Sequence, residues 1–359
     1  MKKLKLGVIV VAAVLLVAGC KADDKKGTAS STSEKTEETT KESSSEAASG
    51  ASESVALEVP AGTLAIRQLY TAPHGDKSFG VTTVVMDGDK ILAAATDEFQ
   101  YVAKADFKGV PSSDGGFGEN YPADLVLASK LENDDAYSKM MAEKGKATKK
   151  YSESMTALME FAAGKTITEL EKELADNETI TDVVTGATFA DANGYLEAVI
   201  DTAKNGFGLA GIEATDGDIK LTHTYAAPHG DKSFAVISVA KIDDKIGAAY
   251  VDEFQFLDKG DVEGVPNSDG GFGENFKEGT ILISKMTNNG AYSKMMAEKG
   301  KATQEYAESM NAILDYVTGK TVAEIDEDLT ANEDMVDVVT GATFSDTTGY
   351  VKAIVEAVK

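Results

Sequence analysis

The sequence has a single cysteine, no tryptophan and three histidines among its 359 residues. One cysteine excludes an internal disulfide, and it also excludes cysteine-ligated iron–sulfur clusters and c-type haem attachment, which need more thiols. The histidines, His74, His223 and His229, are too few for a His-rich metal site, so we predict no metal centre. If this protein carries electrons, we expect its redox group to be organic.

Basic residues are also scarce, since 35 Lys and Arg stand against 60 Asp and Glu and give a formal charge of −25. This composition argues against a nucleic-acid partner, because phosphate contacts need clustered Lys and Arg. Hydrophobic residues make up 42% of the chain, which is enough to fill ordinary cores and excludes global disorder. The length suggests two folded domains.

Residues 1–20 have the pattern of a lipoprotein signal peptide. Three Lys in the first five residues precede an apolar run at 6–17, which is too short for a stable membrane span. The Ala-Gly-Cys sequence ending at Cys20 resembles the bacterial lipobox, whose cysteine is diacylated. A plain signal peptide with an incidental cysteine is the alternative. We predict a lipid anchor on Cys20 and a location on the extracellular face of the cell membrane.

Residues 21–55 consist mainly of Ser, Thr, Glu, Lys and Ala, and they contain no aromatic residue. Such a segment cannot bury enough apolar surface to fold, so we predict a disordered tether. Fully extended, it would reach roughly 115–125 Å. That reach suits standing off a membrane, although a linker of untuned length is equally compatible.

The remaining sequence is one domain written twice, with a constant offset of 155 residues. Four segments recur without change: 72–79 as 227–234, 113–120 as 268–275, 136–148 as 291–303, and 182–189 as 337–344. The period is too long for a solenoid and indicates tandem domains, which we place at 56–204 and 211–359 with a joint at 205–210. The shared segments are loop-like, and loops often carry functional sites.

Each copy predicts strands first and helices afterwards. In the first copy, alternation at 79–85, a turn at Asp87-Gly88 and a strand at 91–96 indicate a β-hairpin. Helical spacing follows at 151–162 and at 196–203, with a capping-box pattern at 166–169 between them that recurs at 321–324. This order predicts an α+β fold.

The segment Asp182–Thr188 has the pattern Asp, two residues, Thr, Gly, Ala, Thr, and it recurs at Asp337–Thr343. This pattern resembles the flavinylation motif of the FMN-binding domain family, which includes subunits of sodium-pumping and Rnf-type redox complexes. In that family an FAD:protein FMN transferase attaches FMN to the last Thr through a phosphoester. The resemblance implies two covalent FMN groups, on Thr188 and Thr343. The other motif residues are Asp182, Thr185, Gly186, Ala187, Asp337, Thr340, Gly341 and Ala342.

Local chemistry is compatible with this assignment. Gly186 and Ala187 are small enough for another enzyme to close over the Thr188 hydroxyl, and a helix is predicted to begin near Asp191. A phosphate on Thr188 would then face the free N–H groups of that helix. Asp182 would repel a phosphate, so we expect it to help the transferase. The alternative is an ordinary strand-to-helix turn, broken by Gly and capped by Thr or Asp.

Other pocket residues are less certain. His74 and His229 follow Pro in a loop, where each could hydrogen-bond to a flavin or simply satisfy nearby backbone. The Gly-rich loops at 113–120 and 268–275 lack the Lys of a phosphate-binding P-loop. Phe117 and Phe272 in them could cover a flavin, with a mobile surface loop as the equal alternative. For Tyr137 we favour core packing over stacking on a flavin.

The full chain resembles the flavinylated lipoproteins of Gram-positive extracellular electron transfer, whose relatives can release the signal tail as a peptide pheromone. The resemblance implies an electron carrier, not an enzyme with a specific organic substrate. It would take electrons from a quinone-linked membrane donor and pass them to ferric iron or free flavins. Two alternatives stay open: an extracellular flavin-dependent reductase, and a non-redox surface lipoprotein for solute binding or adhesion.

Overall fold

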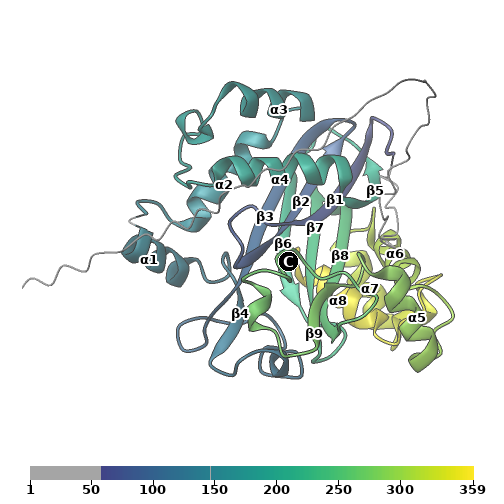
Figure 1. Cartoon of the computed structure of the whole chain (residues 1–359). Helices are drawn as coiled ribbons and strands as arrows, with labels where there is room; N and C mark the ends of the chain where they lie inside the picture. The colour runs from purple at the N-terminus through teal and green to yellow at the C-terminus, as the bar shows by residue number, and fades with distance from the viewer. Residues whose placement is uncertain (1–57, 146) are drawn as a thin grey trace, which may run out of the picture. The chain divides into compact units, whose positions relative to one another are not determined.

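A computed structural model describes residues 58–145 and 147–359 (Figure 1). The predicted signal peptide, Cys20 and the tether at 21–55 lie outside these residues. Both repeats belong to one compact unit, which contains two antiparallel sheets and helices. None of the helices described there is long and apolar enough to span a membrane.

The α+β expectation is confirmed in both repeats. The first contains β1 (Thr63–Thr71), β2 (Ser78–Asp87), β3 (Lys90–Ala103), the 3-10 turn η1 (Gly118–Asn120), β4 (Leu125–Ser129), α1 (Asp134–Gly145), α2 (Tyr151–Ala162), α3 (Ile167–Asp176), the 3-10 turn η2 (Ile180–Asp182) and α4 (Ala192–Asn205). After β5 (Phe207–Glu213), the second contains β6 (Ile219–Ala226), β7 (Ser233–Ile242), β8 (Lys245–Asp258), η3 (Gly273–Asn275), β9 (Thr280–Ser284), α5 (Asn289–Gly300), α6 (Tyr306–Val317), α7 (Val322–Ala331), η4 (Met335–Asp337) and α8 (Thr347–Glu356).

Local sequence signals account for several element boundaries. Gly88 adopts a φ of 58° in the turn between β2 and β3, a conformation that suits glycine. At the start of α3, the Thr166 side chain accepts a hydrogen bond from the Glu169 N–H, while the Glu169 carboxylate accepts one from the Thr166 N–H. This reciprocal pair is the predicted capping box, and Thr321 repeats it at the start of α7.

The joint expected at 205–210 is structured. Asn205 ends α4, and Phe207 begins β5, which pairs antiparallel with β1. Phe207 and Leu209 pack against the hydrophobic core, and these alternating apolar positions suit a strand. The strand orders are therefore β4-β3-β2-β1-β5 in the first sheet and β6-β7-β8-β9 in the second.

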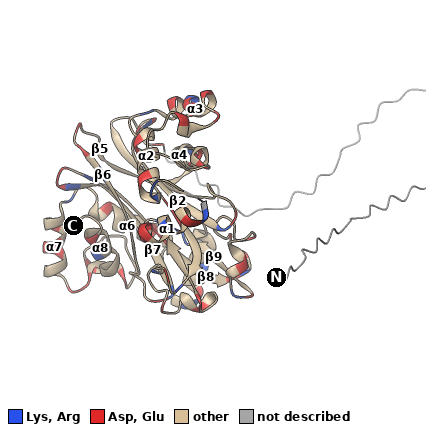
Figure 2. Cartoon of the chain, turned by 90° about the vertical axis from the view of Figure 1, so that its left-hand side faces the viewer, with Lys and Arg blue, Asp and Glu red and all other residues tan. Residues whose placement is uncertain are grey.

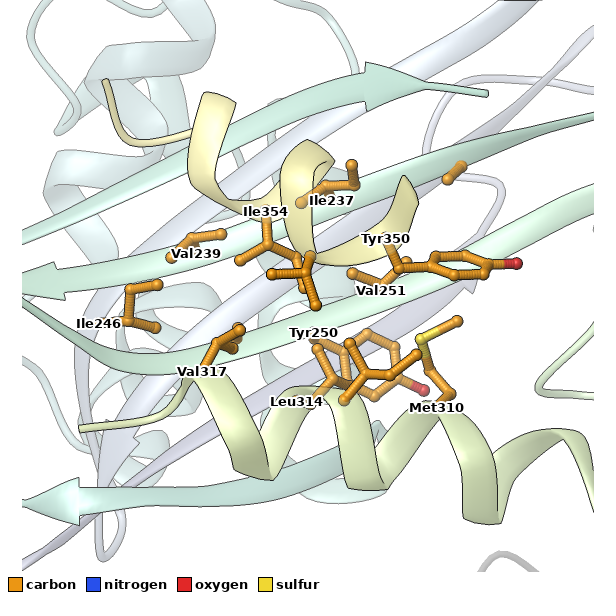
Figure 3. Packing of buried hydrophobic residues seen from close by; sticks show 14 of the residues in the cluster. Ile237, Val239, Ile246, Tyr250, Val251, Met310, Leu314, Val317, Tyr350 and Ile354 are labelled. Atoms are coloured by element: carbon orange, nitrogen blue, oxygen red, sulfur yellow. The ribbon is translucent and has the colours of Figure 1, made fainter. Parts of the chain in front are cut away.

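The two sheets pack on each other, with β1 against β8 and β6 against β3, while helices cover their outer faces (Figure 1). In the second repeat, α6 and α8 bring Leu314 and Ile354 onto the apolar face of β7 and β8 (Figure 3). The space between the repeats holds rings from both, and we call this set the central aromatic cluster. Its fully buried members are Phe79, Phe99, Phe117, Phe234, Phe254 and Phe272.

The Gly-rich loops connect each repeat to the other. The Phe117 N–H donates to the Asp231 carbonyl at 2.7 Å, and the Phe272 N–H donates to the Asp76 carbonyl at the same distance. Both phenyl rings are completely buried in the central aromatic cluster. The expectation that Phe117 or Phe272 covers a flavin is therefore wrong, because both rings are buried in the contact between the repeats. The alternative of a mobile surface loop is wrong for the same reason.

Hydrogen bonds between polar side chains also connect the two repeats. The Tyr225 hydroxyl donates to Asp97, and the Tyr70 hydroxyl donates to the equivalent Asp252. Both carboxyl groups are buried. Burial raises the pKa of Asp97 and of Asp252 to about 6, although each carboxyl group accepts several hydrogen bonds that act to lower its pKa.

We expect the Phe117→Ala substitution to lower the free energy of unfolding by about 3–5 kcal/mol, because it removes a fully buried ring and leaves a cavity between the repeats. The Phe272→Ala variant is the matched control and should lose a similar amount. Equilibrium denaturation checks both variants. A loss below about 1 kcal/mol in each would contradict a shared aromatic core.

We expect a pH dependence from Asp97. The folded pKa of about 6 lies above the unfolded value of about 3.9, so the folded state binds the proton more tightly. Stability should therefore fall as the pH rises from about 4 through 6, by about 3 kcal/mol for this group. Denaturation curves between pH 4 and 7 should show a smaller fall for Asp97→Asn than for the unchanged chain. Equal pH profiles would contradict the raised pKa.

Candidate functional site

A cavity of about 360 Å³ opens in the first repeat beside the end of the Asp182–Thr188 segment. Its wall is formed by residues of α1, of α2, of the turn that follows β4 and of the start of α4. Four aromatic residues line it: Tyr137, Tyr151, Phe189 and Tyr195. The volume lies within the range of small-molecule sites, and the walls are mainly apolar with a few polar groups, as such sites are.

Thr188 lies at this cavity with its residue surface exposed. The preceding Gly186 has a φ of 104°, which side-chain-bearing residues rarely adopt, and Ala187 is buried. This turn fixes the position of the Thr188 hydroxyl, whose oxygen lies 3.3 Å from the Ser154 hydroxyl on α2. The hydroxyl therefore combines a defined position with access from outside.

The rest of the motif lies outside the cavity lining. Asp182 and Thr185 are exposed, and so is Val183, at 43%. These residues form a surface that a modifying enzyme could contact. Asp182 ends η2 and is not among the described residues that line the cavity.

His74 also reaches the cavity, from the loop between β1 and β2. Its Nδ1 lies 2.6 Å from the Asp191 carboxylate at the start of α4. The loop fits there because Gly194 has no side chain, since a Cβ at that position would lie 2.8 Å from the Pro73 carbonyl. His74 therefore has a carboxylate partner, so the reading that it satisfies nearby backbone is not what the structure shows.

The helix begins near Asp191 as the sequence predicts, but the contact with His74 changes how its first turn is capped. Asp191 is the N-cap residue of α4, but its side chain makes no capping hydrogen bond and binds His74 instead. Asp191 is the single acidic residue among the described residues that line the cavity. The helix N-terminus predicted near Thr188 is thus present, without a side-chain cap.

Sequence reasoning missed a buried ion pair at the cavity wall. Lys130 is 2% exposed, and its Nζ lies 2.7 Å from a carboxylate oxygen of Glu98, which is completely buried. The Tyr195 hydroxyl donates to the same oxygen at 2.6 Å. Burial is the largest influence on the pKa of Lys130 and lowers it, but the charge of Glu98, the Tyr137 hydroxyl and the hydrogen bonds to both together raise it overall, so the ammonium group stays charged.

The aromatic wall is built around this pair. The Lys130 ammonium lies 4.9 Å from the centre of the Tyr137 ring, and the Phe189 ring packs 5.3 Å from the rings of both Tyr151 and Tyr195. Tyr137 is therefore almost completely buried, as the predicted core packing requires, and its ring also lines the cavity. A signal was present in the sequence: Asp97-Glu98 interrupts an apolar strand and recurs as Asp252-Glu253.

The second repeat reproduces these contacts. The Lys285 Nζ lies 2.5 Å from Glu253, and the Tyr350 hydroxyl donates to Glu253 at 2.7 Å. The Thr343 hydroxyl oxygen lies 2.9 Å from that of Ser309, and Gly341 has a φ of 94°. His229 lies 2.7 Å from Asp346, as His74 does from Asp191.

Comparison with models of protein families, with curated proteins and with solved structures gives no match for this chain. Within residues 58–145 and 147–359, no group of three or more His, Cys, Asp or Glu is placed to hold a metal ion. The function proposed for this chain therefore rests on the duplicated site.

We expect Lys130→Met to lower the free energy of unfolding by about 3–5 kcal/mol, because it leaves the Glu98 carboxylate buried without its partner. The double variant Lys130→Met/Glu98→Gln should recover most of this loss, since no uncompensated charge remains. Equilibrium denaturation of both variants is the measurement. If the double variant were as unstable as the single one, the loss would not come from the buried charge.

Proposed function

We propose that this chain is an extracellular electron carrier with two covalent FMN groups, one on Thr188 and one on Thr343. The observation that carries the proposal is the position of Thr188. The last Thr of the flavinylation-like segment is exposed, and it lies at the rim of a cavity lined by aromatic side chains. The same local geometry accompanies Thr343 in the second repeat.

The residues at the cavity fit such a group. The Tyr137, Tyr151 and Tyr195 rings offer apolar and aromatic surface for a flat ring system, and Lys130 supplies a buried positive charge. The uncapped start of α4 offers N–H groups toward a phosphate on Thr188. The Asp191 carboxylate opposes an anion there, and it is already engaged with His74, whose Nδ1 lies 2.6 Å away.

The attachment chemistry is balanced without a residue of this chain acting as catalyst. The transferase would break the pyrophosphate bond of FAD, and a phosphoester would form between the Thr188 oxygen and the FMN phosphorus. AMP would leave, and the hydroxyl proton would be released. The exposed residues Asp182 and Thr185 would form part of the surface that the transferase contacts.

Bound FMN supplies one- and two-electron chemistry, while the protein supplies orientation and control of water. Covalent attachment suits a protein outside the cell, because a dissociated cofactor would be lost by diffusion. The proposed anchor is the lipid on Cys20, the proposed donor is linked to membrane quinone, and the proposed acceptors are ferric iron and free flavins. Release of a peptide pheromone from the signal peptide is a secondary part of the proposal.

The charge of the folded unit bears on the acceptor. Asp and Glu residues occur along α3 and α7 on the outside of the molecule (Figure 2). A strongly negative surface attracts cations and disfavours anionic acceptors, with salt limiting the effect to about 8–10 Å. Ferric species carrying positive charge would therefore approach more readily than anionic ferric complexes.

We expect Thr188→Ala and Thr343→Ala each to remove one FMN when the protein is made with a flavin transferase, because each removes one acceptor hydroxyl. The matched control is Thr179→Ala, which changes an exposed Thr outside the motif and should keep both groups. Intact mass and the ratio of flavin absorbance to protein measure the outcome. Retention of both groups by the Thr188 and Thr343 variants would refute the assignment.

A further inference from the structure

The second sheet has one strand fewer than the first in the part of the chain that the structure describes. The first sheet ends in β5, which pairs with β1, whereas the equivalent strand β6 has no described strand beside it on that side. β5 directly precedes the second repeat. The equivalent position before the first repeat is residues 52–58, whose Val-Ala-Leu-Glu ending matches the Ala-Gly-Ile-Glu ending of β5.

Burial differs between the repeats where this strand would lie. In β1, residues 64–66 are at most 2% exposed, but the equivalent residues 219–221 of β6 are exposed or half-buried. In β8, residues 247–250 are buried, but the equivalent residues 92–95 of β3 are only half-buried. Each deficit lies on the side that β5 covers in the other repeat.

A groove of about 350 Å³ follows this uncovered region. It is bounded by Leu92 and Ala93 on β3, by Met155 and Met159 on α2, and by Ile219 on β6. Its lining is largely apolar, and it lies between the edge of β6 and the face of β3. A short apolar strand is therefore an occupant of suitable chemistry.

One glycine pair shows the same vacancy. A Cβ built at Gly319 would lie 3.5 Å from the Ile212 side chain of β5. At the equivalent Gly164, no described atom lies within 4 Å of such a Cβ. Leu57 is the residue equivalent to Ile212 in the sequence.

We propose that residues 52–58 add to β6 as an antiparallel strand and complete the second sheet. The register follows from the pairing of Ala65 with Ala210 in the first sheet, and it places Val55 opposite Lys220. The described chain begins in a suitable place, because Val59 packs against the core of the first repeat as the equivalent Ala214 packs against that of the second.

The added strand cannot copy β5 in every detail. Gly211 lies so close to the Gly247 carbonyl that a Cβ there would collide with it. Ala56 and Leu92 stand at the equivalent positions, so residues 52–58 must lie farther from β3 than β5 lies from β8. The groove provides the room for this larger separation.

This strand would have two consequences that do not depend on the cofactor. It would cover an exposed strand edge, which otherwise can pair with another chain. It would also fix the point at which the tether leaves the folded unit, so that the free tether ends before Ser52. A second copy of the chain is the competing occupant of the same edge.

The test compares two double-proline variants of the full chain in detergent by hydrogen exchange of the β6 amides. Along a strand, every second backbone N–H points toward the same neighbouring strand. Proline has no N–H, so changing two consecutive residues, Ser54→Pro/Val55→Pro, removes one hydrogen bond to β6 whichever of the two faces it. The control is Ser44→Pro/Ser45→Pro, which places the same change farther along the tether. We expect the first variant to exchange the outward-facing β6 amides about tenfold faster than the control.

Two results would overturn the proposal. One is equal β6 exchange in both variants, which would mean that residues 52–58 do not protect this edge. The other is protection in the unchanged chain that falls on dilution, which would assign the edge to a second copy. Neither result affects the proposed flavin attachment, because Thr188 and Thr343 lie on loops outside this groove.

Discussion

The structure depends on two consecutive carboxylates in each repeat, Asp97-Glu98 and Asp252-Glu253. Neighbouring residues of a strand face opposite sides of the sheet, so Asp97 meets Tyr225 of the other repeat while Glu98 meets Lys130 under the cavity. Both carboxyl groups are completely buried, where an unpartnered charge is costly. The contact between the repeats and the wall of the cavity are therefore fixed from the same point on β3.

The four segments that are identical in the two repeats take part in the contact between the repeats or in the wall of the cavity. Two of them join the repeats crosswise: 113–120 binds 227–234, and 268–275 binds 72–79. The other two, 136–148 and 182–189, contribute Tyr137 and Thr188 to the cavity. A loop that contacts the opposite repeat must fit the packing of both repeats. Its sequence is therefore constrained in the same way as that of a core strand.

Much of the local structure could be predicted from the sequence. The hairpin around Gly88, the capping boxes and the helical stripes depend on neighbours in the chain, and local patterns report them. The packing between the repeats could not be predicted, because Phe117 reads the same whether its ring covers a ligand or fills a core. Likewise, Lys130 reads as a surface residue until its distance to Glu98 is known. The position of Thr188 at a cavity needed the tertiary structure, although the motif singled out the residue.

The central claim is that both Thr hydroxyls carry FMN, and intact mass with the visible spectrum tests it most directly. The unchanged chain should be made with and without a flavin transferase. The account predicts two added FMN groups, each less one water, only with the transferase, and a yellow spectrum that dithionite bleaches. A colourless chain of unmodified mass in both preparations would contradict the account and favour a duplicated binding or adhesion lipoprotein.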